Sequence, residues 1–205
     1  MAKSQRDYSE KTTALATIAD EDPIGIALRV ARALEAAGAE YFVGGSVASS
    51  LQGDPRSTND IDFVISLPLG KIDDFRGQLG PDFELDTSQL REAVLRAASS
   101  NAFYLPLVTK IDFFGRGYEP YDEAEFSRRQ VRQVRPSGET LVIKAPEDTV
   151  LRKLLWFRAG GEVSDKQWRD IVSVLRISHD QIDHTYLDTW ATRLGLSTLL
   201  ERAGR

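Results

Sequence analysis

The spacing of hydrophobic positions divides the chain into a part with both helices and strands and a later part with helices alone. Up to Ala145, short runs of branched and aromatic residues, typical of strands, alternate with segments of helical period. After that residue no convincing strand follows, and apolar residues recur at helical spacing only. We therefore predict an α+β fold with a polar N-terminal tail over 1–20, a mixed core over 21–145 and a helical region over 146–205.

The same pattern places the individual elements. Strands are expected over 40–45, 61–66, 82–86, 101–107, 109–115, 130–135 and 140–145. Helices are expected from Asp22-Pro23 to residue 37 and over 46–51, 69–80, 87–99, 121–129, 145–160 and 164–178, with one or two more over 179–204. Pro106 interrupts one strand and indicates an edge or a bend. Thr87 or Ser88 is the expected cap of the helix over 87–99.

Composition adds limits but little chemistry. Of 205 residues, 41% are hydrophobic and 28% charged, which is the usual balance of a globular protein. Cysteine is absent, so disulfides and thiolate metal sites are excluded. No apolar run approaches the roughly 20 residues that span a bilayer, and the N-terminus lacks the core of a secretory signal, so a cytoplasmic protein with no membrane partner is expected. The net charge of −5 argues against a protein that coats nucleic acid, but not against a nucleic-acid substrate.

Three aspartates stand in strand-like segments, where a charged side chain needs a reason. Asp60 and Asp62 begin "DIDFVI", and residues two apart on a strand project from the same face. Asp112 lies midway along "TKIDFF", where a buried and unpaired acid would destabilise the fold. Neighbouring carboxylates repel each other unless a cation lies between them, and such oxygen ligands suit Mg²⁺. Taken singly, the first two could be solvated acids at a strand end, and Asp112 an ion-pair partner of Lys110.

The segment Gly44-Gly45-Ser46 lies where an expected strand passes into a helix. Glycines let the backbone approach a phosphate closely, and the helix N-terminus offers free N–H groups and the positive end of its dipole. The Ser46 hydroxyl can add another donor. A triphosphate held there would meet Asp60 and Asp62 if the two strands are neighbours, although a glycine pair alone is more often a simple turn.

Together these residues resemble the nucleotidyltransferase superfamily, which shares its core with DNA polymerase β. The family pattern is hG[G/S], then DhD on the next strand, and a third acid on a later one. Here it reads "VGGS" over 43–46, "DID" over 60–62 and Asp112, with the lead-in "RSTND" over 56–60 similar to that of minimal bacterial members. The resemblance covers residues 40–175. It implies a nucleotidyltransferase core, a small mixed β-sheet with flanking helices, and a helical region that closes over the nucleotide.

The helical half is similar to AbiEii-type toxins, in which a helix with K-L precedes a helix with R-D and a further acid. Here "RKLL" and "WRDI" place Lys153 and Asp170 at the corresponding positions. Val150 and Phe157 lie on the same helix face as Lys153, so this lysine emerges beside an apolar stripe. The alternatives are a snorkelling surface lysine and, for Asp170, a surface ion pair with Lys166.

The resemblance implies transfer of a nucleoside monophosphate from an NTP to an acceptor hydroxyl, with Mg²⁺ or Mn²⁺ as cofactor. The implied catalytic and metal residues are Asp60, Asp62 and Asp112, and the implied nucleotide-binding residues are Gly44, Gly45, Ser46, Lys153 and Asp170. AbiEii-type relatives act as toxins on RNA such as tRNA and are restrained by an antitoxin, so this is the leading expectation. The alternatives are a small-molecule (antibiotic) adenylyltransferase and a non-catalytic regulatory member of the fold.

Two further groups of side chains could contact nucleic acid. A basic run could grip an RNA backbone, but we favour a solvated face paired with nearby acids; the run consists of Arg128, Arg129, Arg132 and Arg135, and the acids are Asp122, Glu123 and Glu125. Trp156 and Trp168 fall in amphipathic helices, and we interpret them as core residues rather than as base-stacking platforms.

Overall fold

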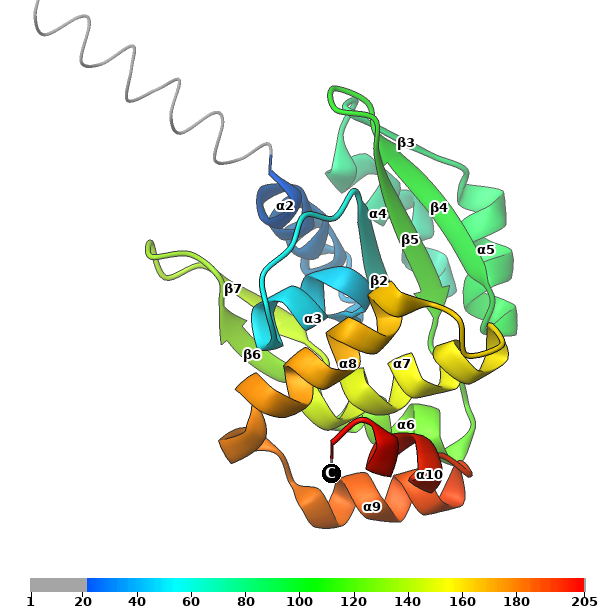
Figure 1. Cartoon of the computed structure of the whole chain (residues 1–205). Coiled ribbons are helices and arrows are strands. Elements are labelled where there is room, and N and C mark those ends of the chain that lie inside the picture. The colour runs from blue at the N-terminus through cyan, green and yellow to red at the C-terminus, as the bar shows by residue number, and fades with distance from the viewer. Residues whose placement is uncertain (1–21, 205) are drawn as a thin grey trace, which may run out of the picture.

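The computed structural model of the chain describes residues 22–204, and the tail expected over 1–20 lies outside the described residues. The centre of this described part is one mixed sheet of seven strands in the order β3-β4-β5-β2-β1-β7-β6 (Figure 1). Its strands are β1 (Glu40–Val43), β2 (Asp60–Ser66), β3 (Phe83–Leu85), β4 (Ser99–Tyr104), β5 (Thr109–Gly115), β6 (Gln130–Gln133) and β7 (Thr140–Ile143). The predicted α+β class, with a mixed sheet followed by helices, is confirmed.

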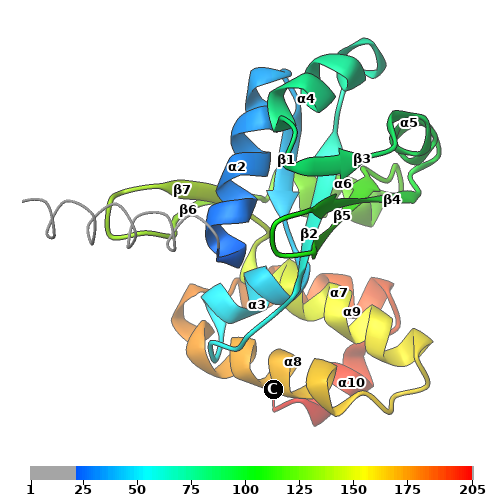
Figure 2. The same ribbon diagram turned by 90° about the horizontal axis from the view of Figure 1, so that it is seen from above.

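Helices cover both faces of this sheet. They are α2 (Pro23–Ala36), α3 (Gly45–Gln52), α4 (Ile72–Leu79), α5 (Thr87–Arg96), α6 (Pro120–Ser127), α7 (Pro146–Ala159), α8 (Asp165–Ile177), α9 (His184–Arg193) and α10 (Ser197–Arg202), with short 3₁₀ turns η1 (Leu69–Lys71) and η2 (His179–Gln181). Figure 2 shows α2 and α4 on one side of the sheet and α3 and α7 to α10 on the other. The helical half of the chain therefore lies against the face opposite α2.

Strand β2 gives the sheet its two different faces. It pairs in parallel with β5 and antiparallel with β1. Ile61, Phe63 and Ile65 are fully buried, whereas Asp60 is exposed and Asp62 half-buried, because successive side chains of a strand point to opposite faces. The apolar face packs against α2 and α4, and the carboxylate face is turned toward the helical half.

Two hydrophobic clusters stabilise the described part of the chain. The first joins the apolar face of the sheet to α2, α4 and α5, with Phe63, Phe75 and Phe113 at its centre. The second is built almost entirely from α7, α8, α9 and α10, with Leu154 and Ile171 fully buried, and takes in Tyr121 of α6. The longest helices of residues 22–204 have 14 residues, too few to cross a bilayer.

Local signals for the helix ends were largely correct. Asp22 caps α2 by accepting a hydrogen bond from the Gly25 N–H at 2.8 Å, and Pro23 occupies the first turn. Ser164 caps α8 in the same way through the Gln167 N–H. For α5 the prediction was wrong, because the cap is the preceding residue, Asp86, whose carboxylate accepts from two backbone N–H groups.

The strand around Pro106 also differs from expectation. β4 begins earlier and ends at Tyr104, so Pro106 lies in the turn that follows and interrupts no strand. β4 pairs with β3 on one side and β5 on the other. It is therefore an inner strand, and the short β3 forms that edge of the sheet. Proline, which lacks the N–H that a ladder needs, is placed where no ladder exists.

Candidate nucleotide-binding site

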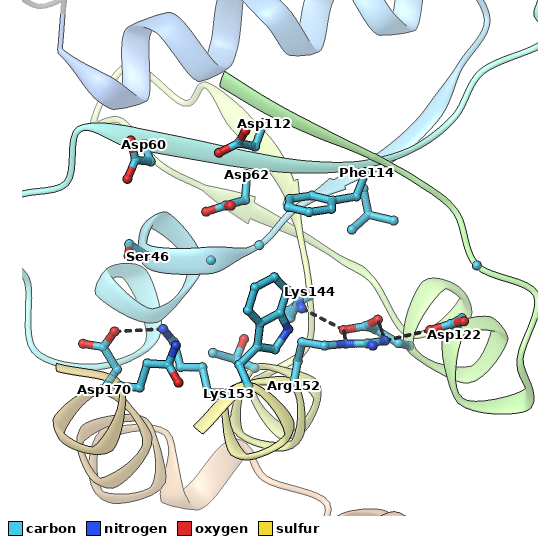
Figure 3. A pocket seen from close by; sticks show the side chains of 18 of the residues that line it. Ser46, Asp60, Asp62, Asp112, Phe114, Asp122, Lys144, Arg152, Lys153 and Asp170 are labelled. Atoms are coloured by element: carbon cyan, nitrogen blue, oxygen red, sulfur yellow. Dashed lines mark hydrogen bonds and ion pairs between the residues drawn. The ribbon is translucent and has the colours of Figure 1, made fainter. Parts of the chain in front are cut away.

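A cavity of about 570 Å³ lies between the carboxylate face of the sheet and the helices α7 and α8. Its volume is within the roughly 300–1,000 Å³ typical of small-molecule sites. Figure 3 shows Asp60, Asp62 and Asp112 on the sheet side, and Arg152, Lys153 and Asp170 on the helical side. All eight residues predicted for the site line this one cavity; they are Gly44, Gly45, Ser46, Asp60, Asp62, Asp112, Lys153 and Asp170.

The parallel pairing of β2 and β5 brings the carboxylates together. Asp62 is the register partner of Asp112, and Asp60 lies two residues before Asp62 on the same face. Burial, followed by the negative charges of Asp112 and Asp60, raises the pKa of the Asp62 carboxyl, against the opposing charges of Lys144 and Lys153. The charged form of Asp62 is therefore held at an electrostatic cost that a bound cation would relieve.

Asp112 has a protein partner of its own. Lys110 lies two residues earlier on β5, and its Nζ contacts both carboxylate oxygens of Asp112 at 2.8 and 2.9 Å. The ion pair considered from the sequence is thus present, and Asp112 nevertheless lines the cavity. Hydrogen bonding to Asp112 raises the pKa of Lys110, so this lysine stays positive beside the three carboxylates.

The glycine loop fits closely against Asp62. The Gly44 N–H donates to the backbone oxygen of Asp62 at 2.8 Å, which fixes the loop beside β2. Gly45 has a φ of +53°, a conformation that favours glycine. A Cβ built on Gly45 would lie 1.7 Å from Oδ2 of Asp62. Only glycine at position 45 leaves room for the Asp62 carboxylate. Helix α3 begins at this residue.

Lys153 and Asp170 meet across the α7–α8 pair. Lys153 Nζ lies 2.8 Å from Oδ2 of Asp170, and Arg56 adds two hydrogen bonds to the same carboxylate at 2.8 and 2.9 Å. Burial works against the charged carboxylate, but these hydrogen bonds outweigh it and lower the pKa of Asp170 to about 2. Asp170 is buried and does not form the surface ion pair with Lys166 considered above.

Arg56 links this cluster to the glycine loop. Its NH2 group donates to Oγ of Ser46 at 2.5 Å while it holds Asp170. The cavity wall beside Ser46 therefore carries the two cations Arg56 and Lys153 against the single carboxylate of Asp170. This excess of positive charge lies where the helix N-terminus of α3 already favours an anion.

A second charged network closes the other end of the cavity. Glu125 is buried and accepts from Lys144 Nζ at 2.7 Å and from Arg152 at 2.5 Å, and Arg152 also contacts Asp122 at 2.9 Å. Burial opposes the charge on Glu125, but the two cations outweigh burial and lower its pKa. Lys144 also lies next to the glycine loop, with its Cε 3.2 Å from the place of a Cβ on Gly44.

Several lining residues were missed or misinterpreted from the sequence. Arg56 was noted only as part of the lead-in motif, and nothing in their local context distinguished Lys144 or Arg152. Trp156 was interpreted as a core residue, but 54% of its side chain is exposed and it lines the cavity. Its position three residues after Lys153 was the available signal, because residues three apart share a helix face.

The basic run pairs with other partners than those expected. Arg128 contacts Glu147 and Asp148, Arg129 contacts Glu40, Arg132 donates to Gln181 and Arg135 contacts Asp22. These partners come from the helical half, from β1 and from the start of α2. The run therefore connects distant parts of the fold, and the local acids expected as partners are engaged elsewhere, as Asp122 and Glu125 are with Arg152.

The carboxylates that line the cavity are suitable ligands for a divalent metal ion, but they do not form a complete ligand set by themselves. Asp60 and Asp62 offer only carboxylate oxygens, and burial next to Asp112 raises the pKa of Asp62, so a bound cation would favour its charged form. Within residues 22–204, however, no three Asp, Glu, His or Cys side chains converge into a finished ligand set. Two carboxylates that need further oxygen ligands match Mg²⁺, which is usually bound by one or two carboxylates plus substrate phosphates.

Comparison with known proteins identifies the class of fold. The chain has a nucleotidyltransferase-like fold. The antibiotic-resistance factor ANT(2″)-Ia aligns with a TM-score of 0.50 at 15% identity, covering 88% of this chain and 97% of that one. An antigenic nucleotidyltransferase-like protein from Paracoccidioides brasiliensis gives a TM-score of 0.48 at 21% identity, covering 86% and 90%. No family profile and no curated protein matches the sequence.

Proposed function

We propose that this chain is a divalent-metal-dependent nucleotidyltransferase that transfers a nucleoside monophosphate from an NTP to an acceptor hydroxyl. The observation that carries the proposal is the pairing of Asp62 with Asp112 next to Gly45, in a cavity whose opposite wall carries Lys153. A phosphate-binding loop, adjacent carboxylates and an opposing cation are the parts that phosphoryl transfer needs, since its catalysis is mostly positioning and charge stabilisation.

Each part has a defined task in this proposal. The N–H groups at the start of α3 and the Ser46 hydroxyl bind the β and γ phosphates, and Lys153 and Arg56 neutralise the pyrophosphate that leaves. Asp60 and Asp62, with Asp112, would hold the divalent ions, which would polarise the phosphoryl oxygens and lower the pKa of the acceptor hydroxyl. The acceptor oxygen bonds to the α phosphorus as the bond to pyrophosphate breaks, and Asp112 accepts the acceptor's proton.

For the acceptor, we propose an RNA such as tRNA, in a toxin-like role of the AbiEii type with a cognate antitoxin. What supports this is the sequence similarity of the helical half, together with the contact between the two residues it singled out, Lys153 and Asp170. Co-expression with a neighbouring gene product that relieves growth inhibition would support the antitoxin.

A small-molecule hydroxyl, as in an antibiotic adenylyltransferase, is the second candidate. The observation that favours it is the engagement of Arg128, Arg129 and Arg135 with carboxylates, because arginines held in this way are less available for an RNA backbone. The likeness to an antibiotic-resistance factor is a likeness of fold and does not decide between the two acceptors.

The deciding experiment incubates the protein with each α-labelled NTP and Mg²⁺ or Mn²⁺, in parallel with total tRNA and with a panel of small-molecule alcohols that includes aminoglycosides. We expect label in one acceptor fraction, dependent on metal and lost in Asp62→Asn. Label in the RNA fraction supports the toxin-like role, and label in a small molecule supports the second candidate. NTP binding without label in any fraction, or label that survives in Asp62→Asn, contradicts the proposed catalysis and favours a regulatory member of the fold.

A further inference from the structure

The floor of the cavity changes character along the two central strands. Asp62 and Asp112 form one register pair, and the pair two residues further on, on the same face, is Val64 and Phe114. Both of these apolar side chains line the cavity. Since two residues of a strand advance by about 6.6 Å, an apolar floor begins one step beyond the carboxylates.

The opposite wall changes in the same direction. Lys153 acts electrostatically on Asp62, and Trp156 follows it by three residues, about 4.5 Å further along α7. The Trp156 ring meets the Phe114 ring edge-on, with centroids 6.4 Å apart. A polar layer of Asp62 and Lys153 is thus followed by an apolar layer of Phe114 and Trp156. An indole that is 54% exposed while it lines a cavity offers a flat surface that the protein leaves uncovered.

A polar group without a protein partner stands beside this aromatic layer. Gln167 lines the cavity from α8. Gln167 lies one helical turn before Asp170 on α8, and Trp156 lies one turn after Lys153 on α7. Because Lys153 contacts Asp170, the adjoining turns that carry Gln167 and Trp156 also face each other. The Oε1 atom of Gln167 has no hydrogen-bond partner among the described residues. A side-chain amide offers one acceptor and two donors, and a buried polar atom left unpaired is costly.

We propose that Trp156, Phe114 and Gln167 form the subsite for the nucleobase of the nucleotide. The base stacks on Trp156 over the Phe114 floor, and the Gln167 amide hydrogen-bonds to the edge of the base. This inference rests on the proposed function, because the adjoining polar layer has to hold the phosphates. A nucleotide has the same order of parts as the cavity, a charged phosphate end joined through ribose to a flat aromatic base.

Trp156 sets affinity in this arrangement, and Gln167 sets preference. Stacking tolerates every base because each has a π-face, so the indole does not discriminate. The amide discriminates, since hydrogen bonds to the edge of a base depend on which groups that edge carries. The charged side chains at the other end of the cavity are already paired with each other, as Glu125 is with Arg152. They are therefore less available to bind the nucleobase than the Gln167 amide, whose Oε1 atom has no partner among the described residues.

The test compares ligands with and without a base. Binding of ATP, GTP, CTP, UTP and inorganic tripolyphosphate is measured by calorimetry with Mg²⁺ and no acceptor, for the wild-type chain and for Trp156→Ala, Trp156→Phe and Gln167→Ala. Trp156→Ala should weaken NTP binding about 5- to 150-fold, the range expected for loss of one base–aromatic stack. It should leave tripolyphosphate binding unchanged. Trp156→Phe should retain most of the affinity, and Gln167→Ala should bring the four NTPs closer together.

A matched control is Trp190→Phe, which changes a tryptophan that packs on Tyr121 away from the cavity; its NTP affinity should equal that of the wild type. Equal loss of NTP and tripolyphosphate binding in Trp156→Ala, or no loss of either, overturns the base subsite while metal-dependent NTP binding still supports the proposed function. If the wild-type chain binds no NTP, both proposals fail together.

Discussion

Gly45 and Asp62 are in such close contact that a Cβ on the glycine would lie 1.7 Å from Oδ2 of the aspartate. This contact holds the glycine loop against the carboxylate face through the side chain of Asp62, while a hydrogen bond from the Gly44 N–H to the Asp62 backbone oxygen holds it through the main chain. The geometry of the loop and the position of the Asp62 carboxylate are therefore one structural feature, and a change in either should disturb both.

The first prediction follows for Gly45→Ala. The methyl group must displace the Asp62 side chain, and alanine must also adopt a φ of +53°, so we expect loss of measurable NTP binding and a lower melting temperature. Gly38→Ala is the matched control, because Gly38 has a φ of +73° and no atom within 4 Å of its Cβ position. It should show the backbone strain alone, about 1–2 kcal/mol, with NTP binding intact. Equal NTP binding by the two variants would contradict the role of the contact.

The second prediction concerns Asp62→Asn, which keeps the shape of the side chain and removes its charge. A metal-bound carboxylate supports several kcal/mol of transition-state stabilisation, so transfer should fall by about 100-fold or more. Because burial and Asp112 disfavour the charge of Asp62, the metal-free variant should melt at a higher temperature than the metal-free wild type. Adding Mg²⁺ and NTP should raise the melting temperature of the wild type only. A variant that melts lower without metal would show that this charge stabilises the fold.

The carboxylate face could be predicted from the sequence because it depends on local periodicity. Acids at every second position of a strand project from the same face in any sheet. Once β2 and β5 are neighbours, their parallel pairing places Asp62 opposite Asp112. The glycine loop was predictable for a similar reason. The change from strand to helix can be recognised from about six consecutive residues of the sequence. Gly45 does take the backbone conformation that favours glycine.

The contacts of the opposite wall were not predictable in this way, because they depend on how α7 and α8 lie over the sheet. The amphipathic pattern of α7 indicates that one face is buried, but not that Trp156 stands at the edge of this face above a cavity. The partners of Arg128 and Arg129 were wrongly predicted for the same reason. Ion pairs formed with Glu147 and Glu40 require the finished fold, whereas the sequence displays only the acids that are close along the chain.

The third prediction uses the low pKa of Asp170. This pKa is about 2 in the folded protein against an ordinary value of 3.8, so its stabilising effect is present above pH 4 and is lost as the pH falls toward 2. Asp170→Asn should therefore lower the free energy of unfolding at pH 7 by about 1–2 kcal/mol after allowance for solvent screening. The difference in the free energy of unfolding between variant and wild type should become smaller below pH 4. Urea unfolding at several pH values measures this difference, and a difference that is independent of pH would assign the loss of stability to packing.

The fourth prediction runs in the opposite direction, at Asp148. This carboxylate is fully buried in α7 and accepts a hydrogen bond from the Tyr186 hydroxyl at 2.8 Å. Burial raises its pKa to about 6, despite that hydrogen bond. Because the folded state then holds the proton more tightly than the unfolded state, the wild-type chain loses stability as the pH rises from about 4 through 6.

Asp148→Asn removes this loss, since the amide oxygen can still accept from Tyr186 and carries no charge. Relative to the wild type, the variant should gain about 2–3 kcal/mol in the free energy of unfolding between pH 4 and pH 7. Asp73→Asn, at an exposed aspartate of α4, serves as the control for the replacement of an aspartate by asparagine away from the buried site. Urea unfolding at pH 4, 5, 6 and 7 gives the comparison. A variant that loses stability relative to the wild type as the pH rises would show that Arg128, which lies 3.9 Å from Asp148, stabilises the charged carboxylate more than burial opposes it.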